Sequence, residues 1–273
     1  MKKIDIHCHT TRRALKEAAV EDASVQHITK LMQKYDIEKT VLLATYFSHR
    51  GSGITNFRLS HWIENREEFA MFGSFDFQHY FFQGLNEVKE LAEEKKIKGI
   101  KIYTCYQDID LKSEKFGEVI SLSSKFQLPL MFHCGYSYQA MRTSSKPSIA
   151  SMVQASDLEH IANLVPHLPV IVCHMSKPYT DDLISTVKRN DNIYTDMSGL
   201  IDSKYDRKDI PECIEEIKKF LYECGPRKLL FGTDFPIQTH QDPVHFIEES
   251  MKKFSLVDKE DVYYNNSWRI LHG

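Results

Sequence analysis

The chain alternates short apolar runs with longer segments whose apolar residues recur at helical spacing. The short runs predict strands at residues 3–9, 39–46, 69–76, 97–103, 128–134, 169–174, 192–197 and 228–233. Between them lie amphipathic segments such as residues 83–96, where Leu85, Val88 and Leu91 share one helical face, and residues 211–224. Strands that alternate with helices predict a parallel sheet with helical crossovers.

Such units build either an open doubly wound sheet or a closed (β/α)8 TIM barrel. The chain has 273 residues, and barrels typically need about 250. No linker or shift in composition marks a second domain. We therefore expect one α/β domain, a (β/α)8 barrel, that spans residues 1–273.

Side chains able to bind a metal end four of the predicted strands. His7 and His9 are alternate residues of one strand, so both imidazoles project from the same face. The runs LPLMFHCG, LPVIVCHMS and KLLFGTDFP supply His133, His174 and Asp234. Closing a barrel places the first strand beside the eighth, whereas an open sheet would spread these ends along a line. The candidate ligands therefore favour the barrel as well.

Three imidazoles and one carboxylate suit a borderline divalent ion. We expect His7, His9, His133 and Asp234 to bind one such ion, with zinc favoured and manganese as the main alternative. If the ion keeps one position open for water, the ion would lower the pKa of that water to about 7. His174 would then polarise a substrate oxygen or orient the water.

Composition narrows the class of protein. The formal net charge is -3, and the 27% of charged residues mix both signs, which argues against a broad basic surface for nucleic acid. No segment has the character of a membrane span or a targeting peptide. Six cysteines without a CxxC pair favour a reducing cytoplasm. The expected partner is a small-molecule substrate, and a homodimer is left open.

Three cysteines lie next to candidate histidines on predicted strands. Alternation predicts that Cys8, Cys134 and Cys173 turn away from the site and pack behind the sheet as small apolar residues. Asn266 is expected to cap the last helix.

The chain resembles the amidohydrolase superfamily, and within it the amidohydrolase-related branch that includes aminocarboxymuconate semialdehyde decarboxylase-like enzymes. The resemblance spans nearly the whole chain. It rests on DIHCH at the start, on His133 and His174, on GTDFP, and on residues 266–271, NSWRIL, which are similar to the family's terminal N-A-x-R-L helix. It implies that His7, His9, His133 and Asp234 bind one metal and that His174 is catalytic.

Related families share part of this pattern. TatD-like nucleases and the polymerase-and-histidinol-phosphatase family also open with HxH, but TatD-like chains carry a glutamate in E-x-G-x-D near the fourth strand, where this chain has KGIKIY. Urease-like members carry a carboxylated lysine there, which makes Lys101 a candidate second-metal ligand. The single-metal interpretation is preferred because GIK before an aromatic residue also occurs in the related branch, where the lysine bridges nothing.

Candidate substrate contacts follow several strands: Arg50, Lys101, Tyr103, Tyr136 and Arg142. Arginine offers a planar fork for carboxylate or phosphate, so these residues favour a small anionic substrate, although a solvated loop charge explains each arginine equally well. Residues 135–156 are long enough to form a lid, and residues 77–82 add aromatic surface for a pocket or a subunit contact.

The function favoured is metal-assisted hydrolysis of an ester, lactone or amide. Asp234 would activate water with the ion and pass the proton to the leaving group, while His174 stabilises the oxyanion. The alternative is non-oxidative decarboxylation of an unsaturated or aromatic carboxylic acid, with Asp234 or His174 as proton donor. A third interpretation is a non-catalytic metal-containing barrel that acts through partners. Fold and ligands alone do not decide among them.

Overall fold

Eight parallel strands form one sheet in the order β1 to β8 in the computed structural model, which describes residues 1–12, 14–16, 18–46, 53–136 and 152–273. The strands are β1 (Lys3–Cys8), β2 (Ile37–Leu43), β3 (Phe69–Gly73), β4 (Gly99–Ile102), β5 (Leu130–Phe132), β6 (Val170–Val172), β7 (Ile193–Asp196) and β8 (Leu229–Leu230). Each lies within or beside a predicted apolar run, so the eight strands are confirmed.

The first and last strands close the sheet into a barrel. The backbone amide of Ile6 donates to the carbonyl of Phe231 at 3.0 Å, and the amide of His9 donates to that of Phe235 at 2.8 Å. Cys8 and Phe235 form a parallel bridge. These bonds lie at the seam between β1 and the chain after β8, and they confirm the predicted (β/α)8 barrel.

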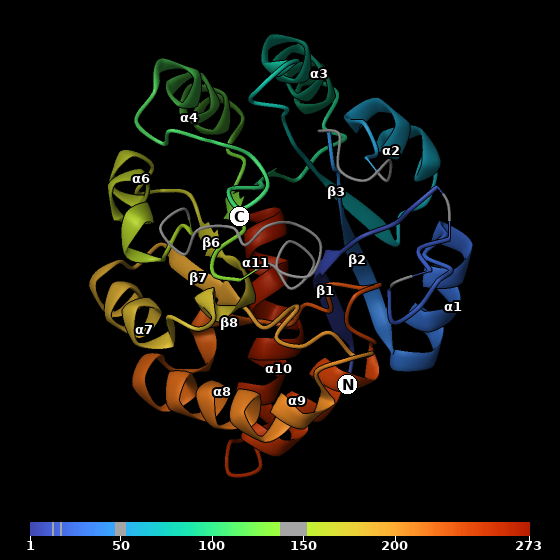
Figure 1. Ribbon diagram of the computed structural model, residues 1–273, viewed down its shortest axis with the longest axis vertical. Helices are drawn as coiled ribbons and strands as arrows, with labels where there is room; N and C mark the ends of the chain where they lie inside the picture. Colours follow the sequence, from blue (N-terminus) through green and yellow to red (C-terminus); the bar gives the residue numbers. More distant parts are fainter. Residues whose placement is uncertain (13, 17, 47–52, 137–151) are drawn as a thin grey trace.

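A ring of helices surrounds the strands (Figure 1). Its members are α1 (Val25–Tyr35), α2 (Asn56–Trp62), α3 (Phe81–Glu93), α4 (Glu114–Phe126), α6 (Glu159–Leu164), α7 (Thr180–Arg189), α8 (Ile210–Cys224) and α9 (Gln241–Ser250). The helices predicted at 83–96 and 211–224 are α3 and α8.

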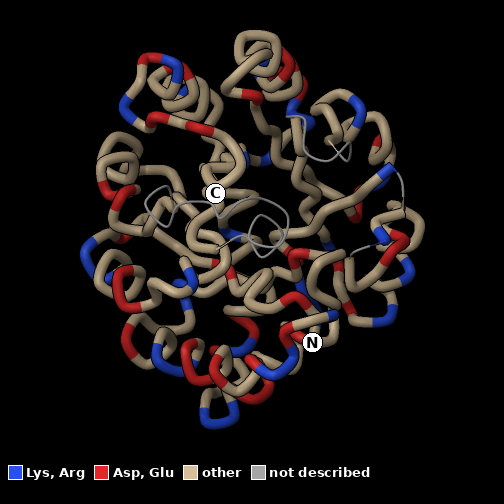
Figure 2. Tube along the Cα trace, in the orientation of Figure 1, with Lys and Arg blue, Asp and Glu red and all other residues tan. Residues whose placement is uncertain are grey.

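Lysine and arginine alternate with acidic residues along the outer helices (Figure 2). No helix among the described residues is long and apolar enough to cross a membrane.

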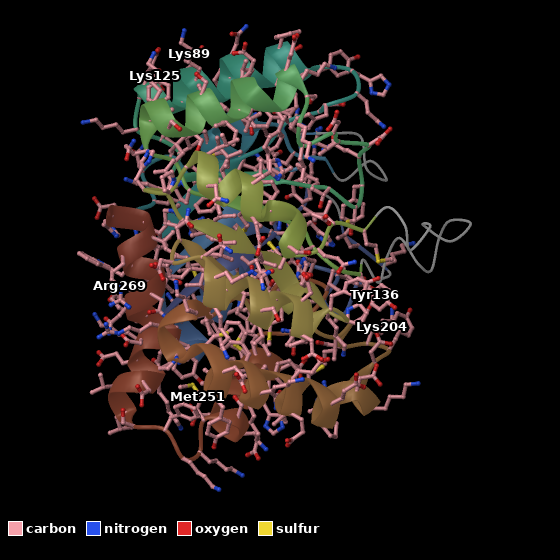
Figure 3. The ribbon with its side chains drawn as sticks, turned by 90° about the vertical axis from the view of Figure 1, so that its left-hand side faces the viewer. Lys89, Lys125, Tyr136, Lys204, Met251 and Arg269 are labelled. Carbon is pink, nitrogen blue, oxygen red and sulfur yellow. The ribbon has the colours of Figure 1, made fainter. Side chains whose placement is uncertain are left out.

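Two apolar layers pack on opposite faces of the strands. The outer layer joins strands to helices and includes Ile100 and Ile102 of β4. The inner cluster fills the barrel and consists of Ile4, Ile6, Val41, Leu43, Ala70, Phe72, Met131, Ile171, Cys173, Leu230, Ile270 and Leu271. The last two belong to α11 (Asn266–His272), which closes the amino-terminal end of the barrel. Tyr136 lies at the opposite end from Arg269 of that helix (Figure 3).

Asn266 does not cap α11, contrary to the sequence-based expectation. The residue before α11 belongs to a π-helical turn, Asp261–Asn265, which follows α10 (Leu256–Glu260), so α11 begins inside a continuous helical stretch. The Asn266 amide instead donates to the carbonyls of Pro226 at 2.9 Å and Leu229 at 2.7 Å. It therefore holds the start of β8 against the closing helix.

Candidate metal centre

The end of β1 brings two histidines towards one carboxylate. The pairing register between β1 and β2 shifts between Asp5 and Cys8, where the HCH motif begins. Asp234 Oδ1 lies 3.4 Å from His7 Nε2 and 3.2 Å from His9 Nε2. Asp234 itself has a left-handed backbone with φ of 54°. The carboxylate thus lies against both imidazoles at the open end of the barrel.

Asp5 fixes this arrangement from within the seam. Its buried carboxylate accepts hydrogen bonds from the Thr233 amide at 3.0 Å, the Thr233 hydroxyl at 2.7 Å and the His7 amide at 3.2 Å. The two segments are far apart in sequence, and Asp5 joins them together with backbone bonds from the Thr233 and Asp234 amides to the His7 carbonyl, at 3.2 and 2.8 Å. The aspartate of DIHCH therefore helps to fix the histidines relative to Asp234.

His174 reaches the site through an unusual turn. Ile171 packs inside the barrel and Val172 outside, so strict alternation places Cys173 inside and His174 outside. The chain leaves the extended conformation after Val172, and His174 has φ of 59°, followed by φ of 49° at Met175. This left-handed backbone turns the imidazole of His174 back to the site.

The predicted orientation of Cys173 is therefore wrong. Cys173 is buried in the inner cluster, whereas Cys8 and Cys134 pack in the outer layer as expected. The prediction assumed that His174 faces inwards by alternation, and the turn invalidates that assumption. Burial raises the pKa of the Cys173 thiol.

His174 and His133 face each other through ring nitrogens. His174 Nδ1 lies 2.8 Å from the Ser198 carbonyl, and a proton on Nδ1 leaves Nε2 as an acceptor. His174 Nε2 lies 3.1 Å from His133 Nδ1, and His133 Nε2 lies 3.4 Å from the Tyr136 carbonyl. Neutral imidazole nitrogens are good zinc ligands, so this donor set fits a divalent ion.

The proposed ligands form two overlapping groups rather than one. Among the described residues, the groups whose donor atoms lie within 4.8 Å of one another are the outer set, His7, His9 and Asp234, and the inner set, His7, Cys173 and His174. His133 belongs to neither set, and it contacts the site through His174, whose Nε2 lies 3.1 Å from His133 Nδ1. The four ligands predicted from sequence are thus brought together only in part.

Asp196 is a site residue that the sequence analysis missed. It ends β7, and its carboxylate accepts from His7 Nδ1 at 2.8 Å, the His174 amide at 2.9 Å and the Ser198 hydroxyl at 2.6 Å. Burial alone would raise the pKa of Asp196, but the charge and hydrogen bond of His7 outweigh burial and lower it. An acidic residue at the end of a strand was the available signal, in the run NIYTD.

Burial and charge set the protonation of the other groups. Burial lowers the pKa of His174 to about 4, so its imidazole is neutral at pH 7. Burial would raise the pKa of Asp234, but hydrogen bonds from His7 and His9 lower it well below its usual range. Burial alone would lower the pKa of His7, but the charge of Asp196 outweighs burial and raises the pKa well above its usual value, so His7 is protonated at pH 7. A divalent ion would displace that proton.

The predicted substrate contacts are distributed differently. Lys101 is wholly buried inside the barrel, and its amine donates to Cys173 Sγ at 2.7 Å, so it does not reach the rim. The Tyr103 hydroxyl donates to the Ala44 carbonyl at 2.9 Å, and its ring lies 6.3 Å from that of His9. Tyr136 borders His133. Arg50, Arg142 and most of residues 135–156 lie outside the described residues.

Known proteins share the architecture of this chain. A family model described as amidohydrolase matches residues 4–273. A comparison with curated proteins finds no match. Among solved structures, a probable 2-pyrone-4,6-dicarboxylic acid hydrolase from Acinetobacter baumannii with bound citric acid is 14% identical, covers 99% of each chain and has a TM-score of 0.68.

Two further structures hold metals. An amidohydrolase from Burkholderia multivorans with bound zinc is 13% identical, covers 99% of each chain and has a TM-score of 0.71. A dihydroxybenzoic acid decarboxylase from Polaromonas with manganese and 2-nitroresorcinol is 14% identical, covers 99% of this chain and 96% of that one, and has a TM-score of 0.67. At these identities the likeness shows the shared fold.

Proposed function

Because the chain belongs to the amidohydrolase family, we propose that it is a metal-dependent hydrolase of a small anionic ester, lactone or amide. The observation that carries the proposal is the convergence of Asp234 Oδ1 on His7 and His9, at 3.4 and 3.2 Å, beside a neutral His174. A base, a neutral imidazole and a cation site then share one end of the barrel.

His7, His9, His133 and Asp234 would hold the ion, and zinc is our choice on the chemistry of the donors. The bound ion would supply Lewis acidity that makes water nucleophilic near pH 7. Asp234, ionised at that pH, takes the proton of the attacking water and delivers it to the leaving group. His174 orients the carbonyl oxygen of the substrate.

The anionic substrate class is supported by the hydrolase of a dicarboxylic acid among similar folds. Arg50 and Arg142 remain candidates to bind the acidic group, and Tyr136 is a third candidate contact. Replacing Arg50 with alanine is expected to raise the KM for an acidic substrate, while an unchanged KM would remove Arg50 from this role.

A second candidate is non-oxidative decarboxylation of an aromatic or unsaturated acid. It is favoured by the dihydroxybenzoic acid decarboxylase of the same fold. The same ligands would bind the substrate, and the proton that replaces carbon dioxide would come from Asp234 or His174. Both candidates require the metal, so the ligands do not separate them.

One experiment separates the two reactions. Protein loaded with zinc or manganese is assayed against a lactone panel by acid release and against aromatic acids by release of carbon dioxide. Metal content per chain is measured in parallel for wild type and His133→Ala. Acid release that depends on the metal supports the hydrolase, release of carbon dioxide supports the decarboxylase, and neither product from a fully loaded protein contradicts both.

A further inference from the structure

A thiol points into the barrel directly beneath the candidate metal centre. Cys173 is wholly buried, and its Sγ lies within 4.8 Å of one ring nitrogen each of His7 and His174. All three members of this inner set are buried, whereas His9 and Asp234 of the outer set are partly exposed. The inner set thus lies deeper in the barrel than the outer set.

The orientation of Cys173 distinguishes it from Cys134, which follows β5. Each of the two cysteines is next to a site histidine, Cys134 after His133 and Cys173 before His174. Cys134, however, packs in the outer apolar layer against the helices. Cys173 packs among inner residues such as Met131 and Ile171. Only Cys173 of this pair is placed to contact a bound ion.

We infer that Cys173 is a metal ligand that makes the centre selective for thiophilic ions such as zinc over manganese; this inference rests on the proposed metal-dependent function. Thiolate sulfur favours zinc and cobalt, whereas carboxylate oxygen and water suit manganese. A coordinated thiol loses its proton to the solvent when the ion binds, so the raised pKa of the free thiol does not prevent binding.

The inner and outer sets share His7. Its Nδ1 donates to Asp196 Oδ2 at 2.8 Å, so we expect Nε2 to be the nitrogen that binds a metal in either set. The two sets would then hold one ion, and Cys173 and Asp234 would be the ligands that favour zinc and manganese respectively.

Lys101 makes a thiolate tolerable at this depth. Its amine donates to Cys173 Sγ at 2.7 Å, shorter than the 3.3 Å between Lys177 and Cys213, the other lysine–cysteine contact among the described residues. An ammonium beside the sulfur compensates the added negative charge. This contact gives Lys101 a sulfur partner, which agrees with the single-metal interpretation.

The test compares Cys173→Ser with the matched control Cys134→Ser, both reconstituted with cobalt. Wild type and Cys134→Ser are expected to bind one cobalt per chain and to show a sulfur-to-cobalt charge-transfer band in the near ultraviolet. Cys173→Ser is expected to lose the band. The ratio of zinc to manganese affinity, measured by competition with a chelator, is expected to fall about tenfold or more in Cys173→Ser alone.

Cobalt bound without the band in wild type, or an unchanged affinity ratio in Cys173→Ser, would overturn the inference. Circular dichroism and thermal unfolding check that each variant folds, and Cys173→Ala provides a second variant if serine destabilises the protein. The proposed function is tested separately. If the protein shows the charge-transfer band but turns over no lactone or acid, the proposed function is contradicted and the assignment of Cys173 as a ligand still holds.

Discussion

At the scale of single residues, the centre depends on hydrogen bonds that choose which nitrogen of each imidazole is free. Asp196 holds Nδ1 of His7, and the Ser198 carbonyl holds Nδ1 of His174. Each ring therefore presents its Nε2 to the site. A histidine bound in this way is both oriented and made more basic, which strengthens it as a ligand.

Replacing Asp196 with asparagine tests this orientation. The amide keeps the shape of the side chain but removes the charge, so the tautomer of His7 is no longer fixed. We expect zinc affinity and kcat/KM to fall by about 10- to 100-fold with little loss of folded protein. Asp191→Asn, at an exposed position two residues before β7, is the control. Unaltered zinc affinity in Asp196→Asn would contradict the role.

His240 carries a different residue-scale prediction. It is buried between Tyr35 and Phe235, with ring centroids 5.7 and 4.9 Å away, and neither ring nitrogen has a hydrogen-bond partner among the described residues. Burial lowers the pKa of His240 from 6.5 to about 3. The unfolded chain binds the proton first on acidification, so this contribution to stability is complete above pH 6.5 and is lost as pH falls towards 3.

His240→Phe should remove this pH dependence. Phenylalanine keeps the ring packing and has no polar atoms to desolvate, so stability at pH 7 should be unchanged or higher. The wild type should lose up to about 1.4 kcal/mol more per pH unit below 6.5 than the variant. Urea unfolding at several pH values measures the slope, with exposed His245→Gln as control. Equal slopes in wild type and His240→Phe would refute the assignment.

At the scale of elements, the turns after β6, β7 and β8 place the chemistry more than the strands do. Gly199, after β7, has φ of 59°, and a Cβ there would lie 2.5 Å from Asp234 Oδ2 and 2.8 Å from His174 Nδ1. The absence of a side chain at Gly199 therefore makes room for two groups of the centre.

Gly199→Ala is expected to disturb the centre as well as the backbone. Gly225 offers a control, because its φ is 82° but no described atom would lie within 4 Å of a methyl group added there. Both substitutions should cost about 1–3 kcal/mol of unfolding free energy. Only Gly199→Ala should also lower zinc affinity, by about tenfold or more. Equal zinc affinity in the two variants would show that the close approach at Gly199 is unimportant.

The same elements show how far sequence patterns reach. Short apolar runs located all eight strands, because a barrel strand is buried on both faces. Apolar residues at helical spacing located the two helices that were predicted, α3 and α8. Alternation also oriented Cys134 correctly. It failed at Cys173, because a left-handed turn in non-glycine residues leaves no trace in an apolar pattern. Asp196 was missed for another reason: its place at the end of a strand was visible in NIYTD, but its role depends on a contact with His7 of β1, which the sequence of β7 does not show.

At the scale of the whole molecule, the barrel is held closed by polar contacts at its seam. Asp5 joins β1 to Thr233, and Asn266 joins α11 to the start of β8. β8 has two residues, so these side chains supply order that a longer strand would obtain from its ladder. The seam and the metal centre therefore share the same supports.

Asn266→Ala should destabilise the entire barrel. The substitution leaves the carbonyls of Pro226 and Leu229 without their donor, at a cost of about 2–4 kcal/mol in unfolding free energy. Urea unfolding measures this loss. Asn265→Ala is the control, since the Asn265 side-chain amide donates to Asp261 alone among the described residues, at 3.2 Å. A loss no greater than that of the control would show that the bonds of Asn266 do not support the seam.

The seam also determines when the centre can exist during synthesis. Asp5 and Thr233 meet although 228 residues separate them. A nascent chain that already exposes His7 and His9 holds no outer set until Asp234 has also left the ribosome. Loading of the outer set is therefore expected only after residue 234 has been synthesised, and chains arrested before residue 173, which lack Cys173, His174 and Asp234, should retain no zinc when isolated on stalled ribosomes.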